Sequence, residues 1–233
     1  MKNLNEIELL VDDILLTDWQ KRKSQKVPET EDVRLGNDAV ELEGTVLYAD
    51  LADSTGLVEG YKDWLAAEIY KAYLVCACEL IKNNGGVITA FDGDRVMAVF
   101  IGDYKNSSAA KCALQINYVV EKTINPKVKK RYENTSFHLQ QSIGIDTSAL
   151  FVARTGVRGA NDLVWVGRSA NYAAKLCGLR EVGFSTFITA EVFQKLSEDL
   201  KYGGTPRQLM WTKFIWEEKG IAAYKSSWWW SPA

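Results

Sequence analysis

The sequence predicts an α+β domain in which a mostly antiparallel central sheet is flanked by helices, with a short helical arm at the N-terminus. Two observations lead to this prediction. Apolar residues recur at helical spacing in some segments and alternate with polar residues in others, so helices and strands are interleaved along the chain. Several neighbouring strand segments are joined by tight turns containing glycine, which is typical of antiparallel hairpins rather than a doubly wound parallel sheet.

The composition is that of a globular protein without a nucleic-acid or membrane partner. The chain has 233 residues, 47% hydrophobic and 25% charged, which suits one large domain. A net charge of −2 with no basic face does not fit a duplex-binding protein. Apolar runs fall short of the roughly 18 residues that span a bilayer, and acidic residues interrupt the N-terminal apolar pattern, unlike a secretory signal. We therefore expect a cytoplasmic protein.

The first third of the chain is expected to form a helix, a linker, a strand and a second helix. Residues 4–19 carry apolar side chains three and four apart, which predicts an amphipathic helix followed by a polar linker. The stretch 44–51 predicts a buried strand, and Ser54 or Thr55 is expected to cap a helix ending near Lys82. We divide the chain into an N-terminal helix and linker, a main domain and a Trp-rich tail, at residues 1–42, 43–225 and 226–233.

The remaining elements alternate strands with helices. The hairpin 86–91 and 95–102 turns at "DGD", and a helix follows it. The expected segments are a helix at 107–124, a strand pair at 136–146 and 149–156, a short helix at 171–179, a strand and helix within 184–200, and a hairpin within 209–225. The tail "SSWWWSPA" is expected to pack onto the N-terminal helix or onto a partner subunit.

Two aspartates lie where a metal ion can be held. Asp50 is at the end of the first strand of the main domain, and Asp94 is at the tip of the hairpin. If the two strands are neighbours, the carboxylates converge on one edge, where each raises the pKa of the other unless a cation neutralises them. Mg²⁺ takes oxygen ligands and leaves room for water and phosphate oxygens. The alternative is a pair of ordinary turn aspartates.

The five residues after Asp50 favour an anion. They lead directly into a helix N-terminus, where free backbone N–H groups and the helix dipole favour negative charge. A metal ion and a triphosphate could therefore lie side by side, as phosphoryl and nucleotidyl transfer require. The candidate substrate-binding residues of this segment are Leu51, Ala52, Asp53, Ser54 and Thr55.

Other reactive side chains give no second site. His138, the only histidine, has no candidate nucleophile or metal ligand within sequence reach, so we expect a structural role for it. No two cysteines form a Cys-x-x-Cys pair, and free thiols without a chemical role are expected. The cysteines are Cys76, Cys78, Cys112 and Cys177.

Four segments carry a family resemblance. In order, they are "GTVLYADLADSTGLVE", "GGVITAFDGDRVMAVF", "SIGIDTSALFVARTG" and "LVWVGRSANYAAKLCGL". Together they resemble the signature segments of the class III nucleotide cyclase catalytic domain, over about residues 43–225. The resemblance implies a ferredoxin-like α+β fold and a head-to-tail homodimer whose active sites lie at the subunit interface.

The resemblance also implies roles for single residues. Asp50 and Asp94 match the aspartates that bind two Mg²⁺ or Mn²⁺ ions, whereas Asp92 has no such match and reads as a solvated turn charge. Asn171 matches the asparagine that orients the ribose. Lys175 stands where the family has an arginine that stabilises the transferring phosphorus, and it keeps the charge without the planar fork. Lys219 is similar to the lysine that binds the triphosphate.

The positions that read a purine base are apolar. Purine cyclases have a lysine where this chain has Ala90 and an acidic or polar residue where it has Val164, and neither side chain here can hydrogen-bond. With this departure the chain resembles the bacterial pyrimidine cyclases of the anti-phage Pycsar system. Three aromatic residues close to these segments could narrow the pocket around a smaller base, although aromatic residues in strands usually pack in the core. They are Tyr48, Phe91 and Trp165.

The resulting hypothesis is a cyclase that converts UTP, or CTP, to the 3′,5′-cyclic monophosphate and pyrophosphate. Its product would act on a separate cyclic-nucleotide-binding effector. Two alternatives stay open: a purine cyclase with an unusual base pocket, and a non-catalytic nucleotide sensor with the cyclase fold.

Overall fold

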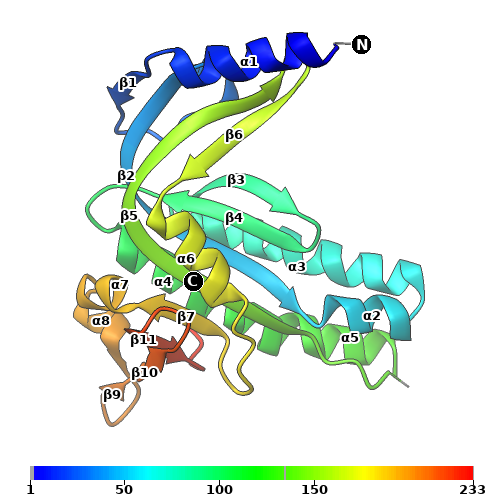
Figure 1. Cartoon of the computed structure of the whole chain (residues 1–233). Helices are drawn as coiled ribbons and strands as arrows, with labels where there is room; N and C mark the ends of the chain where they lie inside the picture. Colours follow the sequence, from blue (N-terminus) through cyan, green and yellow to red (C-terminus); the bar gives the residue numbers. More distant parts are fainter. Residues whose placement is uncertain (1–2, 134, 233) are drawn as a thin grey trace.

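One large mixed sheet forms the centre of the molecule (Figure 1), and the computed structural model describes residues 3–133 and 135–232. The strand order is β10-β11-β7-β5-β2-β4-β3, with β1 also pairing with β2 and β6 with β5. Among these pairs only β1 with β2 and β5 with β7 are parallel. The predicted α+β class with a mostly antiparallel sheet is confirmed. The strands are β1 (Gln20–Lys23), β2 (Asp38–Ala52), β3 (Val87–Asp92), β4 (Arg95–Phe100), β5 (Gln140–Val157), β6 (Ala160–Val166), β7 (Thr186–Thr189), β10 (Thr212–Trp216) and β11 (Ile221–Ser226).

Helices cover both faces of this sheet. On one face, α3 and α4 bury residues such as Tyr73 and Leu114 in the larger apolar cluster. On the other face, α6 contributes Ala173 to a second cluster. The helices are α1 (Leu4–Leu16), α2 (Ser54–Gly60), α3 (Asp63–Asn83), α4 (Lys105–Val119), α5 (Asn125–Arg131), α6 (Arg168–Cys177), α7 (Ala190–Gln194) and α8 (Glu198–Lys201). A 3₁₀ turn (Thr30–Asp32), a π-helical turn (Val120–Ile124) between α4 and α5, and a small β8–β9 pair (Tyr202–Gly203, Gln208–Leu209) complete the fold.

The predicted strand pair 136–146 and 149–156 is wrong, because β5 is one continuous strand. It pairs with β2 from Ala39 opposite Ala153 to Ala52 opposite Gln140. Thr147 and Ser148 lie between the two predicted strands, and their side chains are satisfied inside the fold. Thr45 Oγ1 lies 3.0 Å from Thr147 Oγ1, and Ser148 Oγ is 2.9 Å from Ser169 Oγ. The strand that returns along β5 is β6, and the two extend with β2 as a curved arm toward α1 (Figure 1).

The N-terminal region is more ordered than a helix and a linker. The predicted helix is present but ends at Leu16, and the predicted linker contains β1, which pairs with β2. Strand β2 begins at Asp38, six residues before the start expected at residue 44. No residue of α1 is buried. Its end is held by Asn37, whose Nδ2 donates to the carbonyl oxygens of Ile14 at 2.8 Å and Thr17 at 2.6 Å.

The Trp-rich tail packs on its own domain, which corrects the expectation that it covers the N-terminal helix or a partner. The backbone N–H of Trp230 donates to the carbonyl of Leu114 on α4 at 3.0 Å. Asn117 Nδ2, also on α4, donates to the carbonyl of Trp228 at 3.0 Å. The tail therefore closes the core beside α4.

The close approach of α6 to β5 depends on Gly144. A Cβ atom at this position would lie 2.0 Å from the carbonyl oxygen of Ala173 and 2.4 Å from the backbone nitrogen of Cys177. The same contact region includes the Cys177 thiol, which donates to the carbonyl of Ser142 at 3.1 Å. Burial raises the pKa of this thiol to about 12. Only glycine lets the helix lie directly on the strand.

We predict that Gly144→Ala lowers the free energy of unfolding by about 3 kcal/mol, because the added methyl must displace backbone atoms of α6. Gly60→Ala is the matched control, since a Cβ there meets no atom within 4 Å. The control should shift the stability by less than about 0.5 kcal/mol. Denaturant unfolding measures both, and equal stabilities for the two variants would contradict the close contact.

Candidate active site

Strand pairing brings the two candidate metal ligands together. Asp50, two residues before the end of β2, lies opposite Arg95, the first residue of β4. Asp94 immediately precedes Arg95 in the turn from β3, so both aspartates are at the same edge of the sheet. The expectation that their strands are neighbours is confirmed. Asp92 is exposed on the turn, as a solvated charge would be.

The Asp50 carboxylate is nearly buried between two arginines. Its side chain is 5% exposed, and its Oδ2 accepts from Arg95 Nη2 at 2.9 Å and from Arg180 Nη2 at 2.5 Å. Arg180 lies in the loop after α6 and has a positive φ of 50°. Sequence reasoning missed this residue, because a basic residue in a loop gives no spacing signal that ties it to an aspartate 130 positions earlier.

Asp94 has the oxygen that suits a metal ion. Its Oδ2 is buried and has no hydrogen-bond partner among the described residues. A bound cation would give this carboxylate oxygen the partner that a buried polar atom requires. Two converging carboxylates, one of them unpartnered, fit a hard divalent cation. In the part of the chain that the structure describes, no group of three or more His, Cys, Asp or Glu residues surrounds this point. Two aspartates would thus leave most coordination positions to water, backbone and phosphate oxygens.

The segment after Asp50 turns sharply into α2. Asp53 is the N-cap, with a left-handed φ of 58°, and its Oδ1 accepts from the backbone N–H of Gly56 at 3.2 Å. The prediction of Ser54 or Thr55 as the cap is therefore wrong. The reason is that Asp53 tolerates the left-handed conformation and caps the helix one residue earlier. Residues 52–55 line an open turn, whereas Leu51 is buried at the end of β2.

Asn171 and Lys175 lie on an exposed face of α6, four residues apart. Lys175 Nζ forms an ion pair with Glu218, which lies in the turn between β10 and β11. Lys219 Nζ is 3.3 Å from the same carboxylate, so Lys175 and Lys219 meet at Glu218. The Lys175 hydrogen bond lowers the pKa of Glu218. Within the described residues, no hydrogen bond or ion pair joins this group to Asp50 or Asp94.

One of the two apolar candidate base positions packs near aromatic residues, and the other is exposed. Ala90 on β3 packs in the same apolar cluster as Tyr48 and Trp165, and Val164 on β6 is 39% exposed. The Arg95 guanidinium lies over the Tyr48 ring at 5.9 Å, and burial raises the Tyr48 pKa. Tyr48 and Trp165 are thus packed, as the core alternative predicts. Phe91 is instead 58% exposed, on the turn side of β3.

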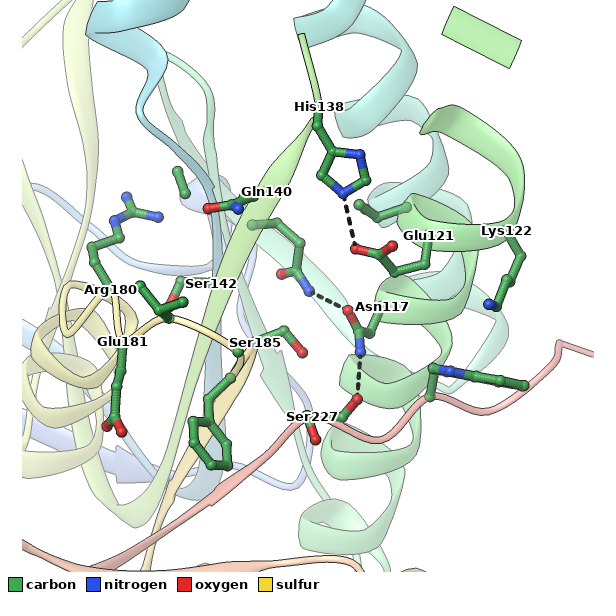
Figure 2. Close-up of a pocket in the computed structure, with 17 residues that line it drawn as sticks. Asn117, Glu121, Lys122, His138, Gln140, Ser142, Arg180, Glu181, Ser185 and Ser227 are labelled. Atoms are coloured by element: carbon green, nitrogen blue, oxygen red, sulfur yellow. Dashed lines mark hydrogen bonds and ion pairs between the residues drawn. The ribbon is translucent and has the colours of Figure 1, made fainter. Parts of the chain in front are cut away.

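A cavity of about 360 Å³ opens beside Arg180 (Figure 2). It lies where the 180–185 loop faces the first residues of β5, and Gln140 and Ser142 line it together with Arg180. His138 is at its far side, with Nε2 3.7 Å from Glu121 Oε1 and 3.3 Å from Asn125 Nδ2. The cavity therefore leaves free space next to one of the two cations that hold Asp50.

Comparison with solved structures places this architecture among the nucleotide cyclases. The fold is similar to that of the adenylyl cyclase CyaB from P. aeruginosa, with a TM-score of 0.68, 18% identity, and coverage of 81% of this chain and 95% of that one. It is also similar to the guanylate cyclase domain of RhGC from Catenaria anguillulae, with a TM-score of 0.63, 15% identity, and coverage of 80% and 97%. The fold is that of a class III nucleotide cyclase.

No protein-family model matches the chain. Proteins with similar sequences nevertheless identify its family within the nucleotide cyclases. The chain is 47% identical over 229 residues to the uridylate cyclase of Xanthomonas perforans, covering 97% of each chain. It is 50% identical over 215 residues to the uridylate cyclase of Burkholderia cepacia, covering 91% of this chain and 92% of that one. The chain belongs to the uridylate cyclase family and is a nucleotidyl cyclase. None of its described helices is long and apolar enough to cross a membrane.

We predict that Asp53→Ala raises the KM for the nucleoside triphosphate and lowers the free energy of unfolding by about 1 kcal/mol or more. Alanine removes the cap of α2 and is strained in the left-handed conformation. Asp53→Asn is the matched control, because asparagine keeps the acceptor and tolerates this conformation. Steady-state kinetics and denaturant unfolding compare the two, and indistinguishable variants would show that the cap does not shape this turn.

Proposed function

We propose that the protein converts UTP to 3′,5′-cyclic UMP and pyrophosphate. Two observations together carry the proposal. The strand register brings Asp50 close to Asp94, and the two positions at which purine cyclases read the base are apolar in this chain. Neither Ala90 nor Val164 can hydrogen-bond to a base through its side chain. The name uridylate cyclase, borne by both sequence relatives, supports uracil as the base.

In this proposal Asp50 and Asp94 hold two Mg²⁺ or Mn²⁺ ions. When bound, such ions lower the pKa of the attacking 3′-hydroxyl and neutralise charge on the triphosphate. The chain's own part is to place the nucleotide. Backbone N–H groups of residues 51–55 and the Lys219 ammonium hold the phosphates, and the Asn171 carboxamide orients the ribose. Lys175 offers a positive charge to the phosphorus undergoing attack.

The proposed active site is completed by a second subunit. Among the described residues, no hydrogen bond or ion pair joins Asn171 or Lys175 to Asp50 or Asp94. In a head-to-tail dimer of the kind that the family resemblance implies, each copy would give the aspartates to one site and α6 to the other. We propose a homodimer with two such composite sites.

The biological setting is also a proposal. The likeness to pyrimidine cyclases of anti-phage systems suggests that cyclic UMP serves as a second messenger in the cytoplasm. A separate cyclic-nucleotide-binding protein would then be the effector. The defence role can be tested by comparing phage infection of cells that carry the active protein with infection of cells that carry an inactive variant.

Incubation of the pure protein with each of the four ribonucleoside triphosphates and Mn²⁺ tests the substrate. We expect cyclic UMP as the main product, because no side chain at the two base positions favours a purine. Cytosine differs from uracil at one edge, so CTP is the strongest competitor. A dominant cyclic AMP or cyclic GMP product would replace this proposal with a purine cyclase that has an unusual pocket.

A non-catalytic nucleotide sensor is the alternative from a different class. One structural neighbour is described as a class III adenylyl cyclase-like ATP-binding protein, with a TM-score of 0.64 and 20% identity. The unpartnered oxygen of Asp94 and the aspartate pair favour catalysis instead. Metal-dependent release of pyrophosphate from UTP distinguishes the two, since a sensor binds the nucleotide without consuming it.

Mixed dimers test the composite site. We predict that Asp50→Asn and Asn171→Ala each abolish activity, and that mixing the two variants restores about a quarter of the wild-type rate. Half of the dimers formed at random contain both variants, and each of these has one intact site of two. Asparagine at position 50 is chosen because alanine would leave two arginines without their shared carboxylate. An inactive mixture of dimers that do exchange subunits would contradict the shared site.

A further inference from the structure

Arg180 is held in an unusual place for a surface arginine. It follows α6 in a loop, adopts a left-handed φ of 50°, and directs its guanidinium to Asp50 Oδ2 at 2.5 Å. A left-handed conformation is uncommon outside glycine, asparagine and aspartate, so a specific contact is needed to maintain it. The contact here is with a candidate metal ligand of the same subunit.

The charges around Asp50 cannot all stay in place when metal ions bind. Two guanidinium groups already share one carboxylate oxygen. Divalent cations at Asp50 and Asp94 would stand within a few ångströms of both, in a site where the Asp50 side chain is only 5% exposed. Repulsion between cations is strong at such distances away from bulk water. We therefore expect one guanidinium to leave Asp50 when metal ions bind.

Arg180 is the arginine that is free to move. Arg95 is the first residue of β4, directly opposite Asp50, and its guanidinium also lies over the Tyr48 ring. Arg180 belongs to a loop, its side chain is 33% exposed, and its only recorded side-chain partner in the described chain is Asp50. The cavity next to it, lined by Gln140 and Ser142, gives the side chain room to change its direction (Figure 2).

We propose that Arg180 acts in cis as an exchangeable counter-ion: it neutralises Asp50 in the metal-free protein and binds the triphosphate of the same site once metal ions take Asp50. This proposal rests on the proposed function. A guanidinium offers the planar, two-pronged donor set that suits phosphate oxygens. That donor set is absent at position 175, where the chain has a lysine tied to Glu218. Arg180 would supply it from the subunit that provides the aspartates.

Two affinities measured separately test the exchange. In Arg180→Ala, Mn²⁺ binding without nucleotide, followed by electron paramagnetic resonance, should be about tenfold tighter, because the ion no longer competes with a guanidinium. The KM for UTP at saturating Mn²⁺ should instead rise about tenfold or more, because a charged phosphate contact is lost. Arg180→Lys should recover part of the UTP affinity. Arg158→Ala, in the exposed β5–β6 turn, is the matched control and should leave both unchanged.

Arg180→Ala is expected to strengthen Mn²⁺ binding and to weaken UTP binding, and these opposite changes distinguish the proposed role from a structural one. A misfolded loop would weaken metal and nucleotide binding together, and that result would overturn the proposal, as would unchanged Mn²⁺ affinity. If the wild-type protein turns over no nucleotide, the proposed function fails. The Mn²⁺ measurement still decides whether Arg180 competes for Asp50.

Mixed dimers assayed below the KM for UTP decide between action in cis and in trans. If Arg180 serves the site of its own Asp50, the pair Arg180→Ala with Asp50→Asn has a lesion in each site and stays impaired. The pair Arg180→Ala with Asn171→Ala keeps one intact site and recovers activity. The reverse pattern would show that Arg180 serves the partner's site. Failure of the Asp50→Asn and Asn171→Ala pair to recover activity would count against the composite site itself.

Discussion

The backbone ladder on both sides of β2 is the constraint on which the site depends. On one side β2 pairs with β5 in continuous register from Ala39 to Ala52, and on the other it pairs with β4 from Thr45 to Asp50. A shift of one residue in either register would turn Asp50 toward the opposite face of the sheet. The same ladder places Arg95 opposite Asp50 and Ser142 on its other side. Backbone hydrogen bonds of the ladder therefore fix the position of the Asp50 carboxylate, and the carboxylate itself takes no part in them.

Once β2 is fixed, α6 is fixed through β5. Gly144 faces the helix within the ladder, and the absence of a side chain there lets the backbone of α6 rest on the strand. The face carrying Asn171 and Lys175 is thus held as firmly as the sheet. By contrast, Arg180 lies in a loop with a cavity beside it, and its side chain is 33% exposed. The rigid elements hold the groups that must keep their geometry, and the loop holds the group whose partner is expected to change.

These differences explain which features the sequence could predict. Alternation and glycine turns predicted the hairpin that presents Asp94, and the register then confirmed its approach to Asp50. The strand break predicted between residues 146 and 149 does not exist, because the hydroxyl groups of Thr147 and Ser148 find partners in distant segments, which the local sequence does not reveal. Arg180 could not be found for the same reason. Its contact with Asp50 spans 130 residues and depends on the path of a loop, which has no periodicity to read.

The electrostatic state of Asp50 links stability to function. An almost buried carboxylate must be neutralised, and in the metal-free protein two arginines do this. In our proposal, metal ions would take over this role, and one guanidinium would then leave Asp50. Asp94 differs, because one of its buried oxygens has no partner among the described residues. Asp50 and Asp94 would hold the metal ion in our proposal, so that its binding would satisfy the free oxygen of Asp94 and remove the need for one guanidinium at Asp50. The arrival of metal would in this way free a phosphate-binding group beside the place where a triphosphate is expected to bind.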